Sequence, residues 1–396
     1  MRRVRPVFMI AALTLVGTLT TAPPRATQAQ RPRIAVSFVI AGSTTMLGLA
    51  QLLSKYYENA HPDIHITVNA TNNADGFTEA CADTAQIGAS DNYIQNAQLA
   101  EPGCSDMINI PVALTVEPVV YNLPGAYFTP RAADNFTPLH PLKLTPRVVA
   151  GIYLCQVSRW DDPAITVLNP GVTLPHQPIR IFQNGEAGGD NAVFDQWLSA
   201  SDARWRPPTD AGQHPQWAPT CRGSVASVGT GQIVQSIANT PYSIGHVGFD
   251  YAVAYRLWAA ALRNAAGQFL TPSLDGAYVA LRRAIAHGFP SDFRRSFVSI
   301  ASPNAYNPSS LEYFLVHRDL RLTPQTDAAT RQAIKDFLHW TVSANGGQKF
   351  IAMIELGRSS GQTHFLLAPT ASVRFPIRCR RPSGVSWTAS SSNSSS

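Results

Sequence analysis

The stretch QIGASDNY (residues 86–93) is the part of the chain around which the rest can be arranged. Its apolar beginning is typical of a β-strand, and this strand runs into Gly88 and then into Ser90 and Asp91. Serine and aspartate are common at turns and helix caps, where their side chains bond to nearby backbone, so a turn or a helix cap is one interpretation of Ser90 and Asp91. The other interpretation is that the Asp91 carboxylate accepts a proton from a ligand.

The first strand of the chain ends in a similar way. Residues 33–40 (RIAVSFVI) are rich in β-branched side chains, and Ser43, Thr44 and Thr45 then open a segment with apolar residues at helical spacing. Hydroxyl groups and unpaired backbone N–H groups at a helix N-terminus suit an anion. Ordinary N-capping is the alternative interpretation of these three residues.

A third polar turn follows the strand predicted over residues 63–69 (DIHITVN), because residues 70–76 (ATNNADG) form a polar loop before a short helix. With the strand at 85–88, three successive strands therefore end in polar turns. Ligands of open α/β sheets bind beyond the carboxyl ends of the strands. These turns predict one side of a ligand cleft.

The later part of the chain repeats this pattern. Residues 107–122 form a long β-rich run that suits a strand leaving one lobe and entering another, and residues 305–316 form a second extended segment. The strand predicted at 179–182 enters the glycine-containing loop 183–191 (QNGEAGGDN), where Asp190 suits the cap of the following helix. This loop is a second candidate anion cradle.

Length and composition favour a globular protein with two lobes. A chain of 396 residues suits two α/β lobes of common size once its two ends are set aside. Charged residues make up 14% of the chain, which excludes a disordered polyelectrolyte. The net charge of +6 falls to +2 when the four arginines of residues 1–29 are removed, and no basic stripe with aromatic residues indicates a nucleic-acid partner.

Residues 1–29 predict export, since arginines, an apolar run and small residues follow one another as in a secretory signal peptide. The apolar run is short for a membrane span, and no cysteine before Cys81 could carry a lipid anchor. We expect a soluble periplasmic or cell-surface protein, with an uncleaved N-terminal anchor as the alternative. Residues 382–396 are serine-rich and predict a disordered tail.

The five cysteines of an exported chain are expected to be mostly paired. Cys81 and Cys104, on either side of residues 86–93, are the best candidate pair. Cys155 with Cys221 is a second possibility, which would leave Cys379 unpaired. The spacing of cysteines and histidines predicts no metal site, and no cofactor is predicted.

Seven segments together resemble the phosphate-binding proteins of ABC phosphate-uptake systems, which belong to the two-lobed periplasmic binding-protein class. They occur in the family's order and cover about residues 33–375. The segments are AGSTT (41–45), QIGASD (86–91), GIYLCQVSRWDDPAI (151–165), VFDQWL (193–198), SIGHVGFDYA (243–252), NPSSLEYFLVHRD (307–319) and FLHWTVSANGGQKF (337–350).

The resemblance implies an α/β fold of two Rossmann-like lobes, joined by crossing strands and closing over a ligand cleft. Lobe I would comprise residues 33–117 with 301–375, and lobe II residues 118–300. It also implies a monomer that delivers its ligand to a membrane permease.

The resemblance further implies which residues of lobe I hold the ligand. The serine and threonine loop of the family corresponds to Ser43, Thr44 and Thr45, and its second loop falls at about Asn72, Asn73 and Asp75. The family's carboxylate corresponds to Asp91 and would accept the proton of a protonated phosphate. An ionised aspartate repels a fully deprotonated anion such as sulfate, so this role gives selectivity.

In lobe II the family has a loop that reads Arg-x-Asp-Gly-Ser-Gly-Thr-Ser. Here the arginine position holds Asn184, so a charge-assisted contact of about 1.5–3 kcal/mol is lost. The threonine position has become acidic as Asp190, and the family's aspartate is replaced by Glu186. The ligand residues implied in this loop are Asn184, Glu186, Gly189, Asp190 and Asn191.

The leading hypothesis is therefore an exported solute-binding protein of an ABC transporter that binds phosphate or a related oxyanion. The acidic loop of lobe II also suits a different solute, cationic or hydroxylated, on the same fold. An exported phosphatase-like hydrolase would need a base, for which His246 is the candidate, but no GxSxG elbow or metal spacing supports an enzyme. A surface receptor without a small ligand is the remaining alternative.

Overall fold

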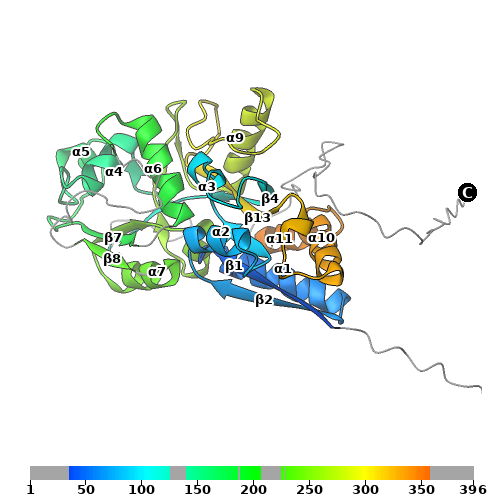
Figure 1. The fold of residues 1–396 in the computed structure, drawn as a ribbon. Coiled ribbons are helices and arrows are strands. Elements are labelled where there is room, and N and C mark those ends of the chain that lie inside the picture. Colours follow the sequence, from blue (N-terminus) through cyan, green and yellow to red (C-terminus); the bar gives the residue numbers. More distant parts are fainter. Residues whose placement is uncertain (1–34, 125–139, 186–187, 207–223, 228, 357–396) are drawn as a thin grey trace, which may run out of the picture. The chain divides into compact units, whose positions relative to one another are not determined.

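The computed structural model describes residues 35–124, 140–185, 188–206, 224–227 and 229–356 (Figure 1). The predicted signal segment 1–29 and the serine-rich tail 382–396 lie outside these residues, and both stay predictions. Within the described ranges, no helix has the length and apolar character that a membrane span requires.

The first of two five-stranded sheets has the order β2-β1-β3-β13-β4. Strand β1 pairs in parallel with β2 and β3, and β13 runs antiparallel to β3 and β4. The parallel register places Gly42 opposite Ala70 and Ala89, so three carboxyl ends meet at one edge as predicted. The strands are β1 (Val36–Gly42), β2 (Ile64–Ala70), β3 (Ile87–Ser90), β4 (Met107–Val116) and β13 (Ser309–His317).

Helices pack on this sheet through apolar side chains at helical spacing. Helix α1 buries Ala50, Leu53 and Tyr57, and the Tyr57 ring lies 5.1 Å from that of Phe337 in α10. The helical elements of this part are α1 (Leu47–Ala60), α2 (Asn73–Cys81), α3 (Asn96–Leu99), η1 (Leu320–Leu322), α10 (Ala328–Thr341) and α11 (Gly347–Leu356).

The second sheet has the order β10-β5-β9-β7-β8, with β7 parallel to β8 and β9. A small third sheet has the order β12-β11-β6. The strands are β5 (Val119–Asn122), β6 (Lys143–Leu144), β7 (Arg180–Asn184), β8 (Val225–Ser227), β9 (Ser243–His246), β10 (Trp258–Ala259), β11 (Ala261–Arg263) and β12 (Phe269–Leu270). The helices are α4 (Pro146–Tyr153), α5 (Pro163–Thr166), α6 (Gly189–Ser201), α7 (Thr230–Asn239), α8 (Phe249–Ala254) and α9 (Leu274–Ala286).

Two extended segments connect the two five-stranded sheets. The predicted run over 107–122 forms β4 and β5, interrupted by Glu117 and Pro118. The chain returns through Pro308 into β13, which lies beside β4 (Figure 1), and the Glu117 N–H donates to the Pro308 carbonyl over 3.2 Å. Helix α9 precedes the return in sequence yet packs against β4 and β13. The lobe bounds given above therefore stay a proposal.

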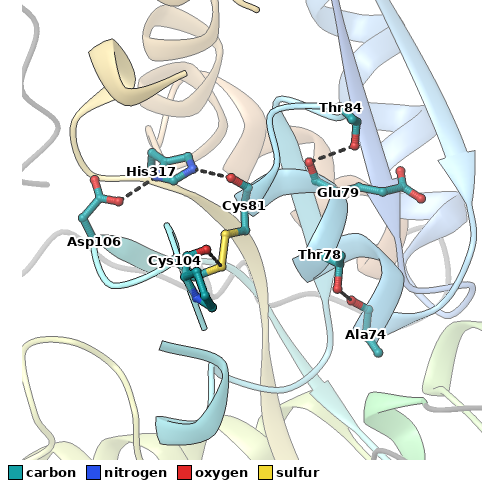
Figure 2. Close-up of a disulfide and its surroundings, with 9 residues drawn as sticks. Ala74, Thr78, Glu79, Cys81, Thr84, Cys104, Asp106 and His317 are labelled. Carbon is teal, nitrogen blue, oxygen red and sulfur yellow. Dashed lines mark hydrogen bonds and ion pairs between the residues drawn. A yellow bond between two sulfur atoms is a disulfide. The ribbon is translucent and has the colours of Figure 1, made fainter. Parts of the chain in front are cut away.

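The disulfide between Cys81 and Cys104 is confirmed (Figure 2). It ties the end of α2 to the segment that leads into β4. His317 lies beside it and bridges two parts of the chain, with Nδ1 2.6 Å from Asp106 Oδ1 and Nε2 2.9 Å from the Cys81 carbonyl oxygen. Cys155 is also disulfide-bonded, whereas Cys221 and Cys379 lie outside the described residues.

Replacing Cys81 and Cys104 together by serine is expected to lower the free energy of unfolding by about 3 kcal/mol, because a loop of 23 residues in the unfolded chain is no longer closed. Urea unfolding followed by circular dichroism measures the change. The wild-type protein under reducing conditions should lose at least this much, because the disulfide of Cys155 is reduced as well. Equal unfolding midpoints for the oxidised wild type and the double variant would contradict the prediction.

Candidate functional site

The loops after β1 and β2 present polar groups at the edge where the strands end. Ser43 Oγ accepts from the N–H groups of Thr45 (3.1 Å) and Met46 (3.3 Å), which shapes the turn before α1. After β2, Asn72 caps α2 by accepting from the Asp75 N–H over 3.0 Å. Helix α2 therefore begins inside the stretch predicted as a loop, and its first residue, Asn73, points its amide to the site.

Asp91 follows β3 directly and is buried, with 2% of its surface exposed. It caps no helix, since α3 begins later and is capped by Gln95, so the helix-cap interpretation is wrong. Ser90 does shape a turn here, because its Oγ donates to the Asn92 carbonyl over 2.7 Å. Its Oδ1 accepts from Asn73 Nδ2 over 2.5 Å, while its Oδ2 has no hydrogen-bond partner in the described part of the chain. Burial raises the Asp91 pKa, and hydrogen bonding from Asn73, the backbone, Ser43 and Thr45 lowers it in part.

The loop between β7 and α6 is closed by hydrogen bonds among its own side chains. Helix α6 begins at Gly189 with Gly188 in the cap position, so the predicted capping role of Asp190 is wrong. The Asp190 carboxylate instead accepts from the Asn191 N–H over 2.8 Å and lies 3.3 Å from Asn184 Nδ2 through each oxygen. Asn191 Nδ2 donates to the Asn184 carbonyl over 3.1 Å. The amide of Asn184 thus holds Asp190 in place.

This loop lies directly against the site residues of the first sheet. A Cβ atom added at Gly189 would collide with Asn73 Nδ2 and Asp91 Oδ1, so a glycine is required for the observed approach. The cavity beside it, lined among others by Asn73, Ser90 and Gly188, measures about 20 Å³. That volume holds about one water molecule. The two loops therefore touch in this structure.

Thr230 is a site residue that the sequence analysis missed. It begins α7, is fully buried, and places Oγ1 3.2 Å from Thr45 Oγ1 and 3.5 Å from Thr44 Oγ1. Tyr251 adds a second contact, since its hydroxyl donates to the Thr44 carbonyl over 2.9 Å. The available signal was a glycine on each side of Thr230 before an apolar helical pattern.

Glu117, between β4 and β5, is the second missed residue. It is 3% exposed, and its Oε1 has no hydrogen-bond partner among the described residues. Burial raises its pKa well above the usual value, and Asp190, Asp91, Asp250 and Glu312 raise it further in that order. Across the described part of the chain, no lysine or arginine is among the groups that shift the pKa of Asp91 or Glu117. The signal was a single acidic residue in a long apolar run.

His246, the candidate base of the hydrolase hypothesis, is a buried residue beside Asn191. It is fully buried and stacks on the Phe194 ring at 4.0 Å. Its Nδ1 is 3.2 Å from the Tyr153 hydroxyl and its Nε2 is 3.2 Å from Asn191 Oδ1. Burial lowers its pKa to about 3, so the ring is neutral at ordinary pH. His246 therefore positions Asn191.

The structure brings together most of the predicted site residues from both sheets. Asn72 and Asp75 are the exceptions, because their side chains bond to each other at the start of α2, and Glu186 lies outside the described residues. In the ranges that the structure describes, no group of three or more His, Cys, Asp or Glu is arranged to hold a metal ion. The residues that meet, directly or through one neighbour, are Ser43, Thr44, Thr45, Asn73, Asp91, Asn184, Gly189, Asp190 and Asn191.

The family model and the related sequences agree on one protein family. The family model described as the PBP superfamily domain matches residues 20–345. The phosphate-binding protein PstS of Xylella fastidiosa is 29% identical over 330 residues, which are 83% of this chain and 82% of that protein. PstS of Methanocaldococcus jannaschii is 26% identical over 74% of each chain.

Solved structures share the fold. A phosphate-binding protein called PfluDING, solved with phosphate bound, aligns with a TM-score of 0.57 at 15% identity over 80% of this chain and 88% of that chain. A putative phosphate ABC transporter substrate-binding protein of Clostridium perfringens, also with bound phosphate, gives a TM-score of 0.53 at 15% identity over 80% and 97%.

The buried histidine gives a prediction for acid stability. Because the folded-state pKa of His246 is about 3 and the ordinary value is 6.5, its contribution is present above 6.5 and is lost as the pH falls. Between about pH 7 and pH 5 the wild type should lose roughly 2 kcal/mol of unfolding free energy that His246→Gln does not lose.

Urea unfolding at several pH values measures both slopes. His140→Gln, which removes an exposed histidine, is the matched control and should keep the wild-type slope. Parallel slopes for the wild type and His246→Gln would show that His246 is not held neutral.

Proposed function

The chain belongs to the PBP superfamily, and from this premise we propose that it is an exported solute-binding protein of an ABC transporter. It binds phosphate or a related oxyanion between the loops of its two five-stranded sheets and delivers it to the membrane permease. Two observations support the ligand class. The chain resembles proteins named for phosphate binding along most of its length, and its site has the hydrogen-bonding groups that an oxyanion requires.

The observation that carries the proposal is the meeting of four helix N-termini around Asp91. Asn73 of α2 and Gly189 of α6 contact the Asp91 carboxylate. Thr45, just before α1, contacts Thr230 at the start of α7. Backbone N–H groups at helix N-termini are unpaired within the helix and carry partial positive charge, so together they attract an anion.

Asp91 makes this anion site selective. An ionised carboxylate only accepts hydrogen bonds, so it binds an oxyanion that carries a proton and repels one that does not. Hydrogen phosphate carries a proton at neutral pH and sulfate does not. Asp91 therefore favours phosphate over sulfate, while Asn73 holds the carboxylate in place.

Ligand binding also requires movement of the loop that carries Gly188 and Gly189. The cavity beside these residues has about 20 Å³, which is too small for a tetrahedral oxyanion. Separation of the Gly189 loop from Asp91 would open the site, and closure over the ligand would restore the contacts. Lobe closure of this kind is the motion by which binding proteins enclose their ligands.

A different polar solute is the second candidate, and the buried carboxylates favour it. Asp91 and Asp190 both raise the pKa of Glu117 by their negative charge. No described lysine or arginine is among the groups that shift this pKa. A cationic or hydroxylated solute would be attracted by such a site. We propose no enzymatic activity, because His246 is buried with both ring nitrogens engaged.

Titration calorimetry of the purified protein with phosphate and with sulfate is expected to give heat with phosphate alone. Asp91→Asn should weaken phosphate binding at least about tenfold and reduce the preference over sulfate, because the amide also donates. Its thermal unfolding should stay close to that of the wild type. Asp336→Asn, on the exposed side of α10, is the control and should bind normally. Absence of heat with phosphate would reject the phosphate ligand in favour of another solute.

Closure of the site gives a second prediction. Gly189→Ala should weaken phosphate binding by about tenfold or more, because its methyl group collides with Asn73 and Asp91. Gly231→Ala in α7 is the matched control, since a methyl group there meets nothing within 4 Å. Calorimetry of both variants measures the difference. Equal affinities would mean that Gly189 does not approach Asp91 in the bound protein.

A further inference from the structure

Glu117 occupies the segment where the chain crosses between its two five-stranded sheets. Its backbone N–H donates to the Pro308 carbonyl of the returning segment over 3.2 Å, so both crossing segments fix its position. With 3% of its surface exposed, the side chain is nearly out of contact with water. A carboxyl group is therefore held at the junction of both sheets. The same junction adjoins Asp91, because Ser310, two residues after Pro308, donates through Oγ to the Asp91 carbonyl over 3.4 Å.

The described groups that interact electrostatically with Glu117 are four carboxyl groups and two tyrosine hydroxyl groups. These groups come from separate elements. Each of them either raises the pKa of Glu117 or has its own pKa raised by Glu117. They are Asp91 after β3, Asp190 in α6, Asp250 in α8, Glu312 in β13, Tyr153 in α4 and Tyr306 before β13. His246 lies beyond Tyr153. Its Nδ1 is 3.2 Å from the Tyr153 hydroxyl, and its ring is neutral.

Three buried polar atoms of this region lack hydrogen-bond partners in the described part of the chain. They are Glu117 Oε1, Asp91 Oδ2 and the Tyr306 hydroxyl, and each residue is at most 3% exposed. Buried polar groups are normally paired, so unpaired ones clustered at a site point to a group that completes them. An oxyanion that carries a proton has both acceptors and a donor to offer.

We infer that Glu117 is a further specificity-determining residue of the proposed site, which keeps its proton and donates it in a hydrogen bond to inorganic phosphate. This inference rests on the proposed function. A protonated Glu117 and an ionised Asp91 have complementary roles, since Glu117 donates to one phosphate oxygen and Asp91 accepts the proton of another. Neutral Glu117 also adds no negative charge beside the anion.

The protonation of Glu117 makes phosphate affinity depend on pH. Burial and four neighbouring carboxylates raise its pKa well above the usual value, which keeps the proton in place at neutral pH. Once the pH exceeds that pKa, Glu117 becomes an anion and repels phosphate. Carboxylic acids kept neutral by an apolar site are known to donate hydrogen bonds to oxyanions in this way.

The test compares phosphate affinity of the wild type and Glu117→Gln by calorimetry from pH 6 to pH 9. Glutamine donates a hydrogen bond and cannot ionise, so both proteins should bind alike at pH 6. Above the Glu117 pKa the wild type should weaken relative to the variant by up to roughly tenfold per pH unit. Taking the ratio of the two affinities cancels the ionisation of phosphate itself.

The matched control is Glu79→Gln in α2, because Glu79 also has a raised pKa but lies near Cys81 at the far end of the helix from Asn73 (Figure 2). Its affinity should follow the wild type at every pH. Glu117→Ala, which has no donor, should bind phosphate about tenfold more weakly at pH 6 than Glu117→Gln does. Equal affinities of these two variants at pH 6 overturn the inference and leave the proposed function intact. Absence of phosphate heat at every pH in both proteins overturns both.

Infrared difference spectra of the wild type with and without phosphate keep the inference testable if Glu117→Gln does not fold. At neutral pH we expect phosphate to shift the C=O band of a protonated carboxyl group, since that group gains a hydrogen bond. If the wild type binds phosphate and its spectrum contains no such band, Glu117 is ionised and the inference is wrong.

Discussion

The burial of the Asp91 carboxylate is the constraint on which the site depends. A carboxylate removed from water needs hydrogen-bond donors, and here Asn73 supplies one over 2.5 Å. The parallel register of β1 with β3 sets Gly42 opposite Ala89, which brings Ser43 near the same carboxylate. Sheet topology therefore has a direct chemical result, because strands in another register would leave this charge without its donors.

Opposing forces act where the two sheets present their loops to each other. Hydroxyl contacts such as that of Thr45 with Thr230 hold the loops together, whereas Asp91 and Asp190 would repel Glu117 if it lost its proton. Repulsion in a buried environment is stronger than in water. A ligand that carries both protons and acceptor oxygens would remove this conflict, so the acidic lining and an oxyanion ligand are compatible when protons are shared.

Much of the fold could be predicted from the sequence because it depends on local pattern. β-Branched runs followed by polar turns gave three strand ends, and cysteines on either side of residues 86–93 gave the pair Cys81 and Cys104. Thr230 and Glu117 had weak local signals and were missed, because their roles arise from neighbours far away in the chain; Thr230 meets a residue 185 positions earlier. The cap of α6 was misplaced since glycine as well as aspartate is favoured there.

The covalent tie between Cys81 and Cys104 also affects when the site is completed. Disulfides form in oxidising compartments, whereas cysteines stay reduced in a bacterial or eukaryotic cytosol. Helix α2 carries Asn73 at its start and Cys81 at its end, so the donor that stabilises the buried carboxylate stands on a helix whose other end is anchored by oxidation. In a chain that crosses a membrane unfolded, this disulfide would form only in an oxidising compartment beyond the membrane. Helix α2, and with it Asn73, would therefore be fixed in place only there.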